Sequence, residues 1–254
     1  MNKYNKNKIS IVIPAYNEEK RIGKTLESCL KTFHDAEIFV AMDGCKDRTF
    51  DIVREYAKNG NDSNNIISYI YSKERLGKGK GLLRAIDKTK GDILVITDAD
   101  ESAPISEILK LTNSLDGNDC VIGSRWLLES EILVKQPLKR RIASRGFNLL
   151  VRTMFGLPFK DTQCGAKVIK KEVMKEIAEN ISTFNFAFDI DLLWQLQRKG
   201  YKIKEISITW EDKDGSSVRL FHEIITMFLA IVRLRIINSS LGFITKCNIA
   251  RLFL

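Results

Sequence analysis

Apolar and polar residues alternate along the first half of the chain in two different rhythms. Short, mainly apolar runs predict strands at 9–14, 37–42, 66–71, 92–97 and 120–123. The first of them is fully apolar, which is typical of a parallel strand that is covered on both faces. Between these runs, apolar residues recur at helical spacing, which predicts helices around 22–33, 50–57, 82–86 and 105–115. Because strand and helix alternate, the pattern predicts an α/β fold with a mostly parallel sheet and helices on both faces.

The C-terminal part of the chain has a different pattern. A polar stretch over 212–217 precedes a more apolar one, so we expect a main domain over 1–217 and a tail over 218–254. Residues 218–237 predict an amphipathic helix whose polar residues fall near one face: Arg219, His222, Glu223, Thr226 and Arg233. The uncharged runs 224–232 and 236–245 are shorter than the ~20 residues that span a bilayer, so no membrane-crossing helix is expected.

A second segment, 135–155, interleaves basic and apolar side chains. Basic amphipathic helices lie in the plane of a membrane surface, attracted by anionic head groups. An ordinary packed helix with solvated charges explains the same pattern. For the tail, burial against a second copy of the chain is the open alternative to a membrane surface.

Composition narrows the possible partners. Forty-one basic and 32 acidic residues give a net charge of +9, which favours nucleic acid, an anionic lipid surface or phosphorylated ligands. The basic residues are interleaved with apolar ones and no nucleic-acid-binding motif occurs, so we expect no nucleic-acid partner; a basic nucleic-acid-binding module is the non-enzymatic alternative. Five scattered cysteines without a Cys-x-x-Cys pair, and two histidines, argue against structural zinc and a disulfide framework.

Acidic and turn-forming residues follow the predicted strands. Asp98 and Asp100 come directly after a buried strand, and parallel strands present such residues at one edge of the sheet. Two carboxylates in this arrangement suit Mg²⁺ or Mn²⁺, which keep several waters and bridge to substrate phosphates. A solvated turn or a cap for the helix after Pro104 is the alternative interpretation.

A glycine- and lysine-rich loop, Arg-Leu-Gly-Lys-Gly-Lys-Gly over 75–81, precedes a predicted helix. Its backbone amides and lysines predict a diphosphate contact, centred on Lys78 and Gly79. The loop matches neither the P-loop nor the dinucleotide-binding pattern, and a flexible solvated turn is the alternative.

Together these loops resemble glycosyltransferase family 2, whose members have the type-A glycosyltransferase fold. The matching segments, in the family's order and spacing, are Pro-Ala-Tyr-Asn-Glu (14–18), Asp-Gly-x-x-Asp (43–47), Gly-Lys-Gly (77–79) and Asp-Ala-Asp (98–100). Later segments are similar to the polyprenyl-phosphate sugar transferases, the dolichyl-phosphate β-glucosyltransferases in particular: Gly-Ser-Arg (123–125), Asp-Thr-Gln-Cys-Gly-Ala-Lys (161–167) and Phe-Asp-Ile-Asp-Leu-Leu (188–193). The resemblance covers about 9–218.

The resemblance implies a role for each matching residue. Pro14, Tyr16, Asn17, Glu18 and Asp43 hold the nucleoside, and Asp98 and Asp100 hold the metal on the donor diphosphate. Arg125 and the segment from Asp161 face the sugar and the acceptor phosphate, and Asp189 and Asp191 are candidates for a general base. Met42 stands where the family usually has an acid and Cys45 where it has serine, so the bound base stays open.

The activity implied is inverting hexosyl transfer, with glucose from UDP-glucose moved to dolichyl or another polyprenyl phosphate. GDP-mannose as donor and another glycan as acceptor are the alternatives. The enzyme is expected to be peripheral, at the cytoplasmic face of a membrane. Cys164 has no histidine near it in sequence, so a covalent route through its thiol is disfavoured.

Overall fold

The computed structural model describes residues 8–59, 65–134, 137–185, 187–213 and 220–238, with side chains in the last segment from Ile225 onward. A seven-stranded sheet has the order β3-β2-β1-β4-β7-β5-β8. The strands are β1 (Ile9–Ala15), β2 (Glu37–Asp43), β3 (Ile66–Ser72), β4 (Ile93–Ile96), β5 (Cys120–Ser124), β7 (Lys167–Lys170) and β8 (Ile203–Ser207). A separate parallel pair joins β6 (Glu131–Val134) to β9 (Thr209–Glu211).

The predicted mostly parallel α/β sheet is confirmed, and every strand expected from the apolar runs is present. β7 runs antiparallel to both of its neighbours, β4 and β5, while the other pairings in the sheet are parallel. The sequence patterns did not predict β6, β7, β8 or β9. β6, β8 and β9 are short and partly exposed, so their periodicity is weak. β7 is buried, but it has only four residues and begins and ends with lysine.

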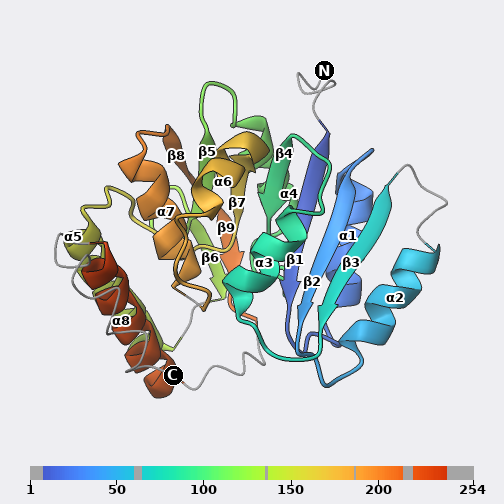
Figure 1. Ribbon diagram of the computed structural model, residues 1–254, viewed down its shortest axis with the longest axis horizontal. Coiled ribbons are helices and arrows are strands. Elements are labelled where there is room, and N and C mark those ends of the chain that lie inside the picture. The colour runs from blue at the N-terminus through green and yellow to red at the C-terminus, as the bar shows by residue number, and fades with distance from the viewer. Residues whose placement is uncertain (1–7, 60–64, 135–136, 186, 214–219, 239–254) are drawn as a thin grey trace.

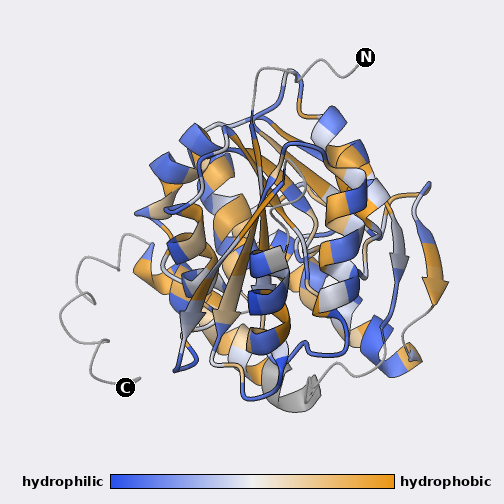
Figure 2. Cartoon of the chain, turned by 90° about the vertical axis from the view of Figure 1, so that its right-hand side faces the viewer, coloured by the Kyte–Doolittle hydropathy of each residue, from blue (hydrophilic) through white to orange (hydrophobic). Residues whose placement is uncertain are grey.

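Helices cover both faces of the sheet, as Figure 1 shows. They are α1 (Ile22–Thr32), α2 (Thr49–Asn59), α3 (Lys78–Ile86), α4 (Ile105–Asn113), α5 (Leu138–Phe155), α6 (Lys171–Ala178), α7 (Phe188–Arg198) and α8 (Leu220–Ile237). Successive residues of a strand point to opposite faces. Accordingly, Ile11 and Ile13 of β1 pack in the core under α1, α2 and α4, whereas Val12 packs in the core under α3, α5, α6, α7 and α8. Figure 2 shows the mainly hydrophobic strands between helices of mixed hydropathy.

The C-terminal helix packs onto the main domain. Ile231 and Leu234 of α8 are fully buried in the core that α5 and α7 share, and α8 contacts α5 directly. Ile225, Phe228 and Leu229 are exposed on the same helix. The expected boundary at 217/218 lies outside the described residues, as do the side chains of Arg219, His222 and Glu223, so the amphipathic character of this helix stays a prediction. Within the described residues no helix is both long and apolar enough to cross a bilayer.

Candidate active site

Three loops that follow parallel strands meet at one edge of the sheet. β1 lies between β2 and β4, and all three run parallel, so the chain leaves each of them on the same side. The first two loops are joined by hydrogen bonds. The amide of Glu18 donates to Thr49 Oγ1 at 2.7 Å, and the amide of Lys46 donates to Asn17 Oδ1 at 2.8 Å. Open α/β sheets bind ligands at this edge, where the strand order changes direction.

The residues expected to hold the nucleoside lie together here. Pro14 is half-buried at the end of β1, and Tyr16 follows it; Asp43, buried, ends β2. The guanidinium carbon of Arg75 lies 3.9 Å from the centroid of the Tyr16 ring, which is a close cation–π contact. This contact therefore joins the loop after β1 to the glycine- and lysine-rich loop after β3. Arg75 was not among the predicted site residues.

Three backbone amides of the glycine- and lysine-rich loop already have hydrogen-bond acceptors within the protein. The amides of Leu76 and Gly77 donate to Asp43 Oδ1 and Oδ2 at 2.6 and 2.9 Å, and the amide of Gly79 donates to the Phe184 carbonyl at 2.9 Å. A Cβ on Gly77, whose φ is +94°, would lie 2.3 Å from that carbonyl oxygen.

The Gly79 amide is already used by the Phe184 carbonyl, so the phosphate contact of Gly79 stays a prediction that this geometry does not support. A Cβ on Gly79 would lie 2.5 Å from the ring of Phe188. Glycine is required at this position because the loop packs closely against the start of α7. The loop's remaining candidate for a diphosphate contact is the side chain of Lys78.

Lys78 belongs to a chain of charged groups that runs from the interior to the sheet edge. Its Nζ lies 3.1 Å from Asp98 Oδ1 and 3.4 Å from Asp189 Oδ2, and Asp189 Oδ1 lies 2.6 Å from Nζ of the fully buried Lys167. Burial opposes ionisation at Asp189, but Lys167 and Lys78 outweigh it and lower the pKa of that carboxyl. A Cβ on Gly165 would lie 1.8 Å from Asp98 Oδ2, so the Asp98 carboxylate rests directly on the backbone of the 161–167 segment.

Asp98 and Asp100 offer the chemistry that a divalent cation needs. Asp98 is 41% exposed, and Asp100 Oδ1 accepts the Ser102 amide at 2.9 Å. Burial, with smaller contributions from Asp100 and Asp98 and against the opposing charge of Arg21, raises the pKa of Glu18 to about 7. No set of three or more acidic, histidine or cysteine ligands is assembled within the described residues. Two carboxylates fit Mg²⁺ or Mn²⁺, which take few protein ligands and complete their shell with water and phosphate oxygens.

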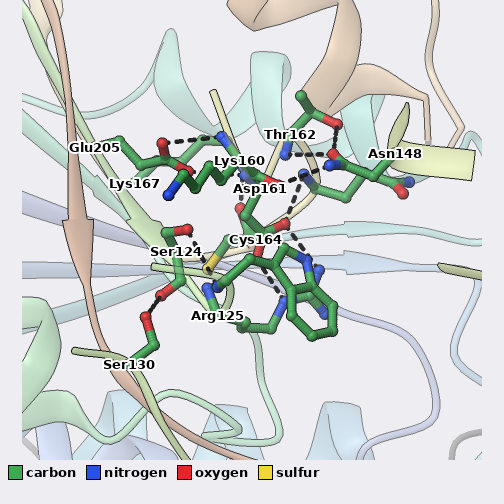
Figure 3. Close-up of polar contacts among 12 residues, drawn as sticks. Ser124, Arg125, Ser130, Asn148, Lys160, Asp161, Thr162, Cys164, Lys167 and Glu205 are labelled. Atoms are coloured by element: carbon green, nitrogen blue, oxygen red, sulfur yellow. Dashed lines mark hydrogen bonds and ion pairs between the residues drawn. The ribbon is translucent and has the colours of Figure 1, made fainter. Parts of the chain in front are cut away.

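Arg125 and Asp161 form a buried bidentate ion pair. Arg125 Nε and Nη2 donate to Asp161 Oδ2 and Oδ1 at 2.7 and 2.9 Å, and the Arg125 amide donates to Oδ2 as well. Figure 3 shows this pair at the centre of a wider network. Glu205 accepts the Asp161 amide at 2.7 Å, and Asn148 of α5 accepts both the amide and the hydroxyl of Thr162.

The Arg125 guanidinium is occupied by contacts within the protein. Asp161 is 1% exposed, and burial is opposed by Arg125, which lowers the pKa of the carboxyl. The Arg125 guanidinium also lies 5.5 Å from the ring centroids of Trp126 and Trp210, and that of Arg145 lies 4.7 Å from Trp126. Arg125 and Asp161 thus fix the 161–165 segment next to Asp98, which is a positioning role for both.

Asp191 does not reach the sheet edge. It is fully buried, and its Oδ2 accepts the amides of Ser182 and Thr183 at 2.7 and 3.0 Å. Gln195 donates to its other oxygen at 3.0 Å. Asp191 therefore anchors the loop before α7, and its role as a general base stays a prediction that these hydrogen bonds do not support. Of this pair, Asp189 shares the Lys78 ammonium with Asp98.

The burial of two further residues of the 161–167 segment bears on the site. Lys167 belongs to a motif of the family, but its complete burial against Asp189 does not follow from the sequence, because lysine is usually exposed. Cys164 is buried, and burial raises the pKa of its thiol to about 12. A protonated, enclosed thiol is a poor nucleophile, as expected for Cys164.

Comparison with known proteins identifies the family. The profile of "Glycosyl transferase family 2" matches residues 10–178, which contain the three loops, the acidic pair and the Arg125–Asp161 ion pair. The chain belongs to glycosyltransferase family 2. It is 31% identical to "Dolichyl-phosphate beta-glucosyltransferase" of Dictyostelium discoideum, over 89% of this chain and 73% of that protein. The human protein of the same name is 28% identical over 91% of this chain.

The resemblance stated from the sequence is thus confirmed, and so is the fold. Identity to "Glycosyltransferase AglD" of Haloferax volcanii is 31% over 89% of this chain, which spans only 36% of that longer protein. Glucosyl-3-phosphoglycerate synthase from Mycobacterium tuberculosis, solved with Mn²⁺, UDP-glucose and phosphoglyceric acid, superposes with a TM-score of 0.67. At 18% identity, covering 92% of this chain and 82% of the other, that likeness establishes the type-A glycosyltransferase fold.

Proposed function

We propose that this family 2 glycosyltransferase moves glucose from UDP-glucose to dolichyl or another polyprenyl phosphate at a membrane surface, with Mg²⁺ or Mn²⁺ bound to the donor. The observation that carries the proposal is the position of Asp98 at the nucleotide-binding edge, beside Lys78 and close in the chain to Asp100. Relatives that share most of this chain's length are named for glucose and dolichyl phosphate. The fold's Mn²⁺- and UDP-glucose-bound representative supports the choice of donor.

On the donor side, Tyr16, Asp43 and Arg75 surround the proposed nucleoside pocket, and Asp98 with Asp100 would hold the divalent ion. That ion supplies charge neutralisation for the departing nucleoside diphosphate. Lys78 supplies a further positive charge on the same side. Asn17 and Glu18 hold the first loop against the second through the hydrogen bonds at Thr49 and Lys46, so they shape this pocket.

On the acceptor side, no strong general base is needed. A phosphate monoester has a second pKa near 6 and is largely dianionic at neutral pH, so its oxygen is already a nucleophile. This agrees with the two candidate bases: Asp191 is buried under the loop that it anchors, and Asp189 is held ionised between two lysines. A single in-line displacement inverts the anomeric carbon and gives a β-linked product from an α-linked donor.

A donor panel tests the assignment. Radiolabelled UDP-glucose and GDP-mannose are each incubated with the enzyme, a polyprenyl phosphate and Mn²⁺ or Mg²⁺, and the product is extracted into organic solvent. We expect label from UDP-glucose in the organic phase, and its loss with EDTA. Label from GDP-mannose alone would replace the proposed sugar, and label that stays in the aqueous phase would replace the lipid acceptor by a soluble glycan.

The proposed membrane contact rests on two exposed apolar stripes. On α5, Leu138, Ile142 and Leu149 are 63–67% exposed and follow one another at helical spacing, next to the basic residues of that helix. On α8, the exposed side chains are Ile225, Phe228, Leu229 and Ile236. These two stripes, which we call the α5–α8 stripes, lie on helices that contact each other. Apolar stripes beside basic residues fit an anionic bilayer.

Vesicle flotation tests the stripes. Replacing Phe228 and Leu229 together by serine should weaken binding to anionic vesicles roughly tenfold or more, because both side chains lose apolar area on the proposed contact. The matched control is Ile66→Ser, which removes a similarly exposed apolar side chain from β3 at the other edge of the sheet. The control should float like the unaltered enzyme.

Equal flotation of the double variant and the unaltered enzyme would remove the α8 stripe from the proposal. If the double variant instead converts an oligomer into a monomer in sedimentation, the stripe is an interface between copies of the chain. A cytoplasmic location, which the sequence resemblance implies, is part of the same proposal and is tested by which side of sealed vesicles supports transfer.

A further inference from the structure

Lys78 joins two carboxylates that differ greatly in exposure. Asp98 is 41% exposed, whereas Asp189 is 6% exposed, and the Lys78 ammonium lies within 3.4 Å of an oxygen of each. Asp189 has a second and closer cation in Lys167, at 2.6 Å. Charge compensation of the buried carboxylate therefore does not depend on Lys78 alone.

The backbone on both sides of Lys78 is fixed. The amide of Gly77 donates to Asp43, and the amide of Gly79 donates to the Phe184 carbonyl. Any Cβ at Gly79 would overlap the ring of Phe188. The loop thus holds the start of the Lys78 side chain in one place, within reach of the acidic edge, and only the side chain itself can change its partner.

Charges in this cluster are nearly balanced without a metal ion. Asp98 and Asp189 contact the ammonium groups of Lys78 and Lys167, so two carboxylates are matched by two cations. A divalent ion entering this cluster alone must share Asp98 with an ammonium. When a divalent ion enters together with a diphosphate, the diphosphate brings negative charge. The same ammonium can then contact the diphosphate and leave Asp98 to the ion.

We propose that the Lys78 ammonium neutralises Asp98 in the free enzyme and so competes with the divalent ion for that carboxylate. When the ion and the donor bind together, the ammonium moves to the donor diphosphate. Lys78 then makes metal binding and nucleotide binding mutually dependent, so that the enzyme takes up the ion with its donor. This inference rests on the proposed metal–diphosphate site and adds to it the residue that couples the two ligands. Coupling of this kind is reciprocal, so nucleotide must tighten metal binding as much as metal tightens nucleotide binding.

Direct Mn²⁺ binding tests the proposal without any activity assay. Free Mn²⁺ is followed by electron paramagnetic resonance during titration of the full chain, with and without UDP. In the unaltered enzyme, UDP should tighten Mn²⁺ binding strongly. In Lys78→Gln, Mn²⁺ without UDP should bind roughly tenfold more tightly than in the unaltered enzyme, since repulsion between the ammonium and a nearby divalent ion is removed. The gain from UDP should shrink correspondingly.

Two control variants separate charge from position. Lys88→Gln removes the same charge from an exposed site just beyond the other end of α3, and its Mn²⁺ affinity should stay within about twofold of the unaltered enzyme. Lys78→Arg keeps the charge and should keep the weak binding of Mn²⁺ alone. Asp189 retains Lys167 in both Lys78 variants, so unchanged thermal unfolding is expected and is checked first.

Equal Mn²⁺ affinities of Lys78→Gln and the unaltered enzyme without UDP, with UDP still tightening both, would overturn the role of Lys78 and leave the proposed function intact. Failure of every form to bind Mn²⁺ even with UDP would instead overturn the metal–diphosphate site itself.

Discussion

The acidic residues of this glycosyltransferase divide into two groups with opposite surroundings. Asp98, at the carboxyl edge of β4, keeps 41% of its side chain exposed and contacts one lysine. Asp161 and Asp189 are 1% and 6% exposed, and each is held in an ion pair of 2.7 Å or shorter. In sequence these aspartates look alike, and all were predicted to act in the site.

The difference shows which carboxylates are ready for a ligand. A buried carboxylate must be compensated inside the protein, because an unpaired charge in the interior is strongly unfavourable. Asp161 and Asp189 are therefore occupied before any substrate arrives. Asp98 and Asp100 are only partly buried, at the edge where the nucleotide is expected. We therefore expect the exposed group to bind the ligand, whereas the buried group holds the loops that surround it.

The largest expected effect is on catalysis at the exposed group. Asp98→Asn and Asp100→Asn should each lower sugar transfer by roughly 10²–10³-fold or more, because the charge that holds the cation on the leaving group is lost. Their free energies of unfolding should change by less than about 1 kcal/mol, since a half-exposed ion pair contributes little. Transfer assays and urea denaturation measure the two quantities. Near-normal transfer by both variants would contradict the metal site.

Substitutions in the buried group should mainly lower the stability of the fold. Asp161→Asn leaves the Arg125 guanidinium buried without its counter-charge and should lower the free energy of unfolding by about 3–5 kcal/mol. Adding Arg125→Met should recover part of this loss, because the uncompensated charge is then removed as well. Urea denaturation of the two single variants and the double variant gives the coupling energy. Additive losses would show that the pair does not stabilise the fold as a unit.

The exposure of the Glu18 side chain is intermediate between those of the two groups. We expect from Glu18 a smaller effect on stability, and one that depends on pH. Its pKa is about 7 in the folded protein, against 4.5 for an unperturbed glutamate, so the folded state favours the protonated form. The stability that Glu18 contributes is complete below pH 4.5 and is lost as the pH rises through about 7. The partly exposed side chain is screened by solvent, so we expect a loss of roughly 1–2 kcal/mol.

Glu18→Gln cannot ionise and provides the comparison. The difference in unfolding free energy between the unaltered enzyme and this variant should shift in favour of the variant as the pH rises from about 4.5 to about 8. Urea denaturation at several pH values measures it. A difference that stays constant over this interval would show that Glu18 ionises in the folded protein as easily as in the unfolded chain.

How much the sequence predicted depends on the kind of residue. The apolar runs predicted β1 to β5, because β1, β2, β4 and β5 are almost wholly buried and the edge strand β3 is also mainly apolar. They did not predict β7, which carries the fully buried Lys167 and runs antiparallel between two parallel pairs. Among the predicted site residues, Asp98, Asp100, Tyr16 and Asp43 lie where the motifs placed them, at or just after the ends of parallel strands, and their roles stay predictions.

The sequence by itself determined the order of strands and helices as far as β5 and the edge of the sheet where acidic and turn residues gather, because these follow from local periodicity and spacing. It also indicated the family, through the order and spacing of its motifs. The tertiary structure alone decided which of the aspartates stay exposed, that Arg125 is committed to Asp161, that Gly79 is needed for packing, and that Lys78 bridges Asp98 and Asp189. These outcomes depend on contacts between segments far apart in the chain. Burial and charge compensation are properties of such contacts, and no local pattern encodes them.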